Sequence, residues 1–141
     1  MMDSKGQVSL EYLLIFSVSL LILIVFTLPF LEESMDYTFD ASDSIKAKAD
    51  LSKIAHAIKE VYGQGQGSKQ TVYLDVDKSV RIDIRDNHIS SKIKLKNNNQ
   101  KEIKIDVNSK LKSKTFKLSK GKKTFVIEWP EDSQNMVIYQ K

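Results

Sequence analysis

The fold of this chain follows from one stretch, KGQVSLE at residues 5–11, which leads directly into YLLIFSVSLLILIVFTLPFL at residues 12–31. No charged side chain occurs in residues 12–31. About 20 apolar residues are enough for a helix to cross the hydrocarbon core of a bilayer. A carboxylate, Glu11, stands at the head of the run, where a charge beside lipid costs free energy unless it is paired. The sequence therefore predicts an N-terminal apolar helix that can anchor the chain in a membrane. Its first turns carry a carboxylate that such an anchor does not need.

The apolar run is expected to remain in the mature protein. It exceeds the core of an ordinary secretory signal, which is about 7–15 residues long. The sequence that follows, EESMD at residues 32–36, lacks the small-x-small pattern of a signal-peptidase site. Lys5 precedes the run and acidic residues follow it, and positive charge favours the cytoplasmic side. We expect the N-terminus inside and the bulk of the chain outside.

Pro29 and four small polar residues within the apolar run each allow two structural interpretations. Pro29 removes one backbone donor, so it predicts either a kink or break near residues 25–30 or the end of the membrane helix. The small polar residues either allow close helix approach and hydrogen bonds between helices or bond back to their own backbone. They are Ser9, Ser17, Ser19 and Thr27.

The next segment, residues 32–62, continues as an amphipathic helix. Its apolar positions recur at spacings of three and four, which is the helical period. The Gly-rich string GQGQGS at residues 63–68 then predicts a helix stop and linker. The expected stripe consists of Ile45, Leu51, Ile54, Ala55, Ile58, Val61 and Tyr62.

Residues 69–141 change to a period of two, which predicts strands separated by turns. We expect an antiparallel meander of six or seven strands, with one apolar face covered by the helix stripe. The fold class is therefore α+β, a long hydrophobic-then-amphipathic helix packed on a C-terminal antiparallel β-sheet domain. The expected strands are 71–76, 79–85, 88–96, 100–107, 115–118, 124–129 and 136–139, and the expected core face carries Val80, Ile82, Ile84, Ile93, Leu95, Ile103, Ile105 and Val107.

The string GQVSLE at residues 6–11, joined to an apolar run, resembles the class III signal peptide of archaeal type IV pilins. The resemblance covers residues 5–11 closely and the apolar run by type. It implies that a membrane-embedded prepilin peptidase recognises Gln7, Ser9 and Glu11. That enzyme would cut between Gly6 and Gln7 on the cytoplasmic side. Residues 1–6 would then be a cleavable leader and residues 7–31 the membrane and filament-core helix, with Glu11 as the characteristic pilin glutamate.

Elementary chemistry agrees with that implication. Gly6 has no side chain, so an extended backbone can enter a narrow protease site there. The cut creates an α-amino group on Gln7, and Glu11 lies one helical turn further along the same face. Pairing of this carboxylate with the amine of a neighbouring subunit would offset both desolvation costs and set the axial register. The alternative is that Glu11 simply extends toward the lipid headgroups.

Composition argues against several functional classes. The chain has no cysteine, which excludes disulfides, thiol catalysis and cysteine-based zinc sites. Its two histidines, His56 and His88, fall on different expected elements without convergent carboxylates. The Gly-rich string lacks the preceding strand and the Lys-Ser/Thr of a phosphate-binding loop. We expect no enzyme, no metal site and no cofactor.

Charge is divided along the chain. Residues 32–60 are rich in acids, whereas residues 78–123 contain fifteen Lys and Arg against four acids. Aromatic residues are not interleaved with these lysines as a base-stacking surface requires, so a nucleic-acid partner is not expected. The lysines indicate a solvated face that also protects edge strands. The alternative is adhesion to anionic surfaces, or DNA capture, by an exposed filament.

Together with these features, the resemblance implies a structural subunit of an archaeal type IV pilus-like surface filament, and we expect that filament to serve adhesion. Its expected partners are other copies of itself, the prepilin peptidase, an assembly platform with its ATPase, and the membrane before assembly. The precursor would lie in the cell membrane and the product in an extracellular pilus. Two alternatives stay open. One is a single-pass anchored protein with an extracellular β-rich binding domain, and the other is a minor pilin of an archaellum-like or secretion machine.

Overall fold

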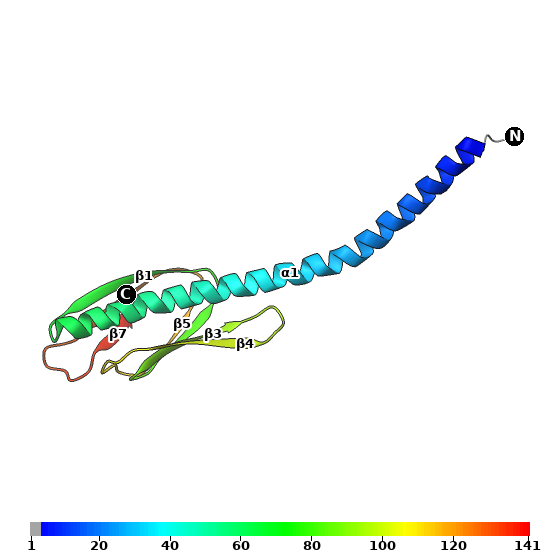
Figure 1. Ribbon diagram of the computed structural model, residues 1–141. Coiled ribbons are helices and arrows are strands. Elements are labelled where there is room, and N and C mark those ends of the chain that lie inside the picture. The colour runs from blue at the N-terminus through cyan, green and yellow to red at the C-terminus, as the bar shows by residue number, and fades with distance from the viewer. Residues whose placement is uncertain (1–3) are drawn as a thin grey trace. The chain divides into compact units, whose positions relative to one another are not determined.

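The computed structural model describes residues 4–141, so positions 1–3 of the expected leader lie outside the described residues. The chain divides into two compact units, Met1–Phe39 and Asp40–Lys141. One helix, α1 (Ser4–Gln64), contributes to both units (Figure 1). The expected α+β fold class is confirmed, because the remainder of the chain is antiparallel sheet.

Helix α1 runs without interruption through Pro29. Proline at this position neither breaks nor ends the helix, so the expected break and the expected helix end were wrong, while the kink stays a prediction. The physical reason is that proline removes one hydrogen bond of the backbone ladder, while the long helical segments on both sides keep theirs. The expected continuity of residues 7–31 with residues 32–62 is confirmed.

The Gly-rich string caps the helix instead of forming a free linker. Residues 63 and 64 are still helical, and Gly65 adopts a left-handed φ of 87° while its N–H donates to the Val61 carbonyl at 3.0 Å. The Ser68 hydroxyl donates to the same carbonyl at 2.9 Å. Gly67, also left-handed, donates its N–H to the Trp129 carbonyl at 2.7 Å. The string is therefore an ordered turn that fixes the start of the first strand.

The described residues form seven strands, close to the seven ranges that the sequence predicted. They make two antiparallel sheets, ordered β1-β6-β7 and β4-β3-β2-β5, so the single meander was wrong. Sequence neighbours β1 and β2 belong to different sheets, as do β5 and β6. The bounds are β1 Lys69–Val76, β2 Val80–Ile84, β3 His88–Lys94, β4 Gln100–Asp106, β5 Lys114–Leu118, β6 Gly121–Glu128 and β7 Val137–Gln140.

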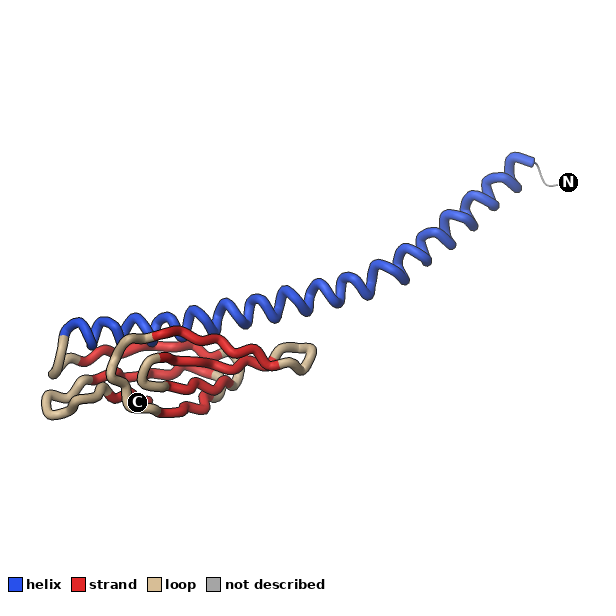
Figure 2. The backbone as a smooth tube through the Cα atoms, turned by 60° about the horizontal axis from the view of Figure 1, so that its bottom comes forward, coloured by secondary structure: helices blue, strands red, loops and turns tan. Residues whose placement is uncertain are grey.

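The core of the second unit lies between the end of α1 and both sheets, and Figure 2 shows that part of the helix running along the strands. Five members of the expected helix stripe are buried, from Leu51 to Val61, together with Ala57, which was not expected. Ile45 and Tyr62 are instead 70% and 46% exposed, so their assignment to the stripe was wrong. On the sheets Ile82, Ile84 and Val107 are buried as expected, while Val80, Ile93, Leu95, Ile103 and Ile105 are only half-buried.

Candidate processing and assembly site

The four residues expected to carry processing and assembly lie in the first two turns of α1. Gly6, Gln7, Ser9 and Glu11 are all exposed and helical. Glu11 is the fourth residue after Gln7, which places the two on one face and about 6 Å apart along the helix axis. The structure therefore places Gln7 and Glu11 on one face, as the sequence predicts.

Gly6 has no structural necessity within this fold. A Cβ atom added there would meet nothing within 4 Å, and its φ lies outside the left-handed region that favours glycine. Glycine also weakens a helix relative to alanine by about 1 kcal/mol. A glycine at this position is therefore not explained by the packing of this chain.

Glu11 has no ion-pair or hydrogen-bond partner among residues 6–141, and its neighbours Leu10 and Tyr12 are 62% and 70% exposed. The backbone nitrogen of Gln7 is still part of the peptide bond to Gly6 in the intact chain, so it carries no charge. Within residues 6–141 Glu11 is therefore an exposed carboxylate between apolar neighbours.

The apolar run exposes its side chains on every side of the helix. The large apolar residues between Val8 and Leu31 are 41–70% exposed, and the most apolar part of the helix has a mean hydropathy of 2.7 with none of it buried. The helix is long and apolar enough to cross a membrane. A helix that is apolar all round requires lipid or other helices around it. An isolated chain in water supplies neither.

Two hydroxyls within the run are already satisfied by their own helix. Ser17 Oγ donates to the Leu13 carbonyl at 2.8 Å, and Thr27 Oγ1 donates to the Leu23 carbonyl at 2.6 Å. The back-bonding interpretation is confirmed for these two residues. Ser9 and Ser19 make no such bond within the described part of the helix, so interhelical hydrogen bonding remains a prediction for them.

The second unit carries a cationic row that sequence reasoning did not identify. Arg81 on β2 lies directly opposite Lys117 on β5 and opposite Lys92 on β3. All three side chains are exposed. Like charges directly opposite on adjacent strands destabilise a sheet. The lysines were noted as a solvated face, but their alignment with Arg81 depends on strand register, which the sequence alone does not reveal.

One carboxylate beside this row offsets part of the repulsion. Asp83 Oδ1 accepts a hydrogen bond from Thr115 Oγ1 at 2.6 Å and one from Arg81 Nε at 3.2 Å. The hydrogen bond from the Thr115 hydroxyl is the main reason that the pKa of Asp83 lies below its ordinary value. Burial opposes this shift, and Arg81 and Arg85 add to it. Lys92 also lies opposite Glu102 on β4, with no ion pair between the two in the described chain, and Lys117 lies opposite Arg81 alone.

Comparison with known proteins supports the N-terminal interpretation. A family model described as class III signal peptide matches residues 4–30. This is the signature of archaeal type IV pilin-like precursors and indicates a type IV pilin-like secreted or assembled protein. It also implies a prepilin peptidase and assembly machinery in general, and it fits a membrane-anchored or secreted location. None of the curated proteins and none of the solved structures matches the chain.

Proposed function

We propose that this chain is the structural subunit of an archaeal type IV pilus-like surface filament, cut between Gly6 and Gln7 and assembled through its N-terminal helix. The observation that carries the proposal is the combination of an unpartnered Glu11, a Gly6 without a structural reason, and an all-round apolar helix behind them. The class III signal peptide supports the same interpretation.

Cleavage and assembly form one chemical sequence in this proposal. Hydrolysis of the Gly6–Gln7 bond frees an α-amino group, which is protonated near neutral pH. That ammonium pairs with Glu11 of a neighbouring copy, and the apolar runs replace lipid contacts with contacts to one another. Because the amine of one copy pairs with the carboxylate of the next, the contact is heterologous, and such a contact generates an open helical filament when the rotation between copies does not close.

The proposed role is structural and not enzymatic. The machinery that extracts the helix from the membrane uses ATP, and the pilin itself supplies the apolar surface and the ion pair. In the precursor the apolar helix lies in the cell membrane. After assembly the β-rich second unit is displayed on the outside of the cell.

The exposed β-rich unit is proposed to adhere to anionic surfaces. The support comes from the row Lys117, Arg81 and Lys92, because an external anion would relieve the repulsion between these cations. Contacts of this kind weaken as salt is added. Adhesion through the cationic row should therefore decrease steeply with ionic strength.

The decisive experiment is mass spectrometry of the protein from cells, together with imaging of their filaments. A mature N-terminus at Gln7 in a protein that forms the bulk of a filament supports the proposal. An intact leader on a protein that stays in the membrane would instead establish the plain anchored protein with a β-rich binding domain. A mature N-terminus at Gln7 in a protein that is scarce in filaments would indicate a minor subunit.

Adhesion is tested separately on filaments that assemble normally. The triple variant Arg81→Gln, Lys92→Gln, Lys117→Gln should bind anionic beads several-fold more weakly than the parent filament. The matched control replaces Lys48, Lys59 and Lys122, which are exposed and lie outside the row. Equal loss in both variants would show that net charge matters and the row does not.

A further inference from the structure

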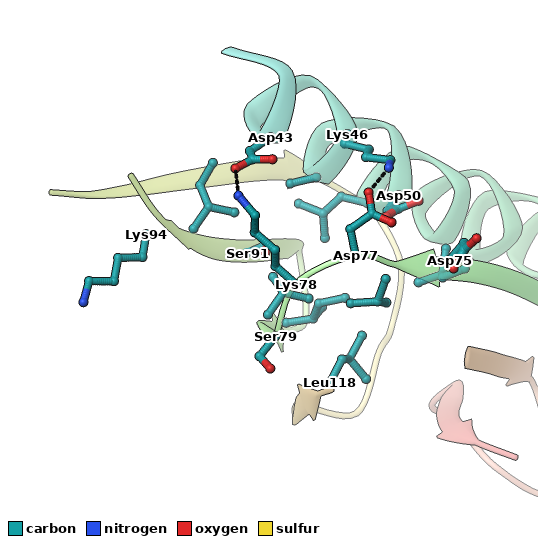
Figure 3. Close-up of a pocket in the computed structure, with 17 residues that line it drawn as sticks. Asp43, Lys46, Asp50, Asp75, Asp77, Lys78, Ser79, Ser91, Lys94 and Leu118 are labelled. Carbon is teal, nitrogen blue, oxygen red and sulfur yellow. Dashed lines mark hydrogen bonds and ion pairs between the residues drawn. The ribbon is translucent and has the colours of Figure 1, made fainter. Parts of the chain in front are cut away.

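A cavity of about 160 Å³ lies inside the second unit, between α1 and the sheets. Its walls come from the helix, β1, the turn that joins β1 to β2, and strands β2, β3 and β5 (Figure 3). Every lining residue belongs to Asp40–Lys141, so the cavity is a property of that unit alone. The apolar run and the processing segment take no part in it.

The walls of the cavity are mainly aliphatic. Leu51 comes from the helix, Leu74 and Val76 from β1, Ile82 from β2 and Leu118 from β5. These five side chains are at most 5% exposed. Such walls favour an apolar body in the cavity, because water there would lack hydrogen-bond partners.

One polar side chain among the lining residues contradicts this apolar character. Ser91 on β3 is 2% exposed, and its hydroxyl has no hydrogen-bond partner within the described chain. It lies opposite Ile82 on β2 and Ile103 on β4, in a row whose other members are apolar. An unpaired buried hydroxyl costs free energy that an apolar side chain would avoid. A partner from outside the chain would remove that cost.

The mouth of the cavity is charged, and two ion pairs account for four of its charged side chains, while Asp75 and Lys94 also line the cavity and belong to neither pair. Lys46 on α1 pairs with Asp77, and Lys78 Nζ lies 2.6 Å from Asp43 Oδ2 on α1 (Figure 3). Both pairs join the helix to the β1–β2 turn beside the opening. A charged ligand would have to compete with these ion pairs for a partner. A neutral ligand needs no ion-pair partner and can enter without disrupting them.

We propose that this cavity binds a small neutral molecule with a compact apolar body and one hydroxyl group, which forms a hydrogen bond with Ser91 Oγ. The size follows from the volume, because a dry cavity of about 150 Å³ accepts a benzene-sized ring. The hydroxyl is required because Ser91 is the one buried polar side chain among the lining residues that lacks a partner in the described chain. The site is independent of processing and of filament formation.

The test compares phenol with toluene, two probes of equal heavy-atom count that differ in the hydroxyl. Each is titrated into the full-length protein in lipid nanodiscs, with its free concentration measured. The readout is the NMR signal of ¹³C-labelled methyl groups at Ile82 and Leu118. The reference is Ile127, a buried methyl group that does not line the cavity. Phenol should shift the cavity methyl signals saturably, with a Kd about tenfold lower than that of toluene.

Variants at position 91 distinguish a built site from mere solubility in an apolar space. Ser91→Val should bring phenol to the affinity of toluene, while Ser91→Thr, which keeps a hydroxyl, should preserve the preference. Equal affinities in the unchanged protein would overturn the proposal. So would shifts of equal size at Ile127, or shifts confined to methyl groups of residues 8–31, which would mean that phenol had only dissolved in the bilayer.

Discussion

Replacing Glu11 with Gln should abolish filament assembly while leaving cleavage intact. The substitution keeps the length and shape of the side chain and removes its charge. In the assembled state the Gln7 ammonium would then stand unpaired among apolar helices. The two groups of a pair sit on one face of the helix, about 6 Å apart along the axis. A neighbouring copy must therefore be displaced by a matching amount for its ammonium to reach Glu11.

The size of the effect follows from the surroundings of the pair. Residues flanking Glu11 are exposed apolar side chains, so in a bundle the ammonium would be removed from water on every side. Breaking a buried pair by removing one partner costs about 3–5 kcal/mol. Since each 1.4 kcal/mol is about tenfold in an equilibrium constant, every subunit contact should weaken by roughly 100-fold to several thousand-fold.

The assay measures two quantities in the same cells. Mass spectrometry reports whether the mature chain starts at Gln7, and filament mass sheared from the surface reports assembly. Glu33→Gln is the matched control, because Glu33 lies on the same helix beyond the apolar run and accepts a bond from Tyr37 at 3.3 Å. Normal filaments from the Glu11→Gln protein would refute the register argument, as would equal loss in the control.

Three further predictions follow from the described contacts. Gly6→Val should leave the helix in place and block removal of the leader, because a branched side chain would obstruct a narrow protease site; mass spectrometry of the intact protein checks this. Ile58→Ala should destabilise the second unit by about 2–5 kcal/mol in urea unfolding followed by Trp129 fluorescence, because Ile58 is 0% exposed. Ile45→Ala, at a 70% exposed position of the same helix, should change stability by less than about 0.5 kcal/mol. Asp83 contributes stability that is present above its unfolded pKa of about 4 and is lost as pH falls through its lower folded pKa, so Asp83→Asn should flatten the acid limb of a stability–pH profile. Asp106→Asn, at an 82% exposed side chain, should leave that limb unchanged.

Local patterns predicted much of this molecule. The apolar run needed only composition and length, and all seven strand ranges followed from alternation and turn residues. The class III signal was also readable, because it is a short contiguous segment. The prediction of which helix residues are buried was less accurate. Ile45 and Leu51 both fit its period, yet one is 70% exposed and the other 1%, because the sheets cover only part of the helix.

The sequence by itself determined the apolar anchor, the class III signal and the α+β class, since each depends on residues that are neighbours in the chain. Only the tertiary structure decided how seven strands divide into two sheets, which cations face one another and which hydroxyl is buried without a partner. Periodicity reports which face of a strand is apolar but does not report which strand lies beside it. Pairing is set by packing between segments far apart in sequence, and that energy is absent from any local pattern.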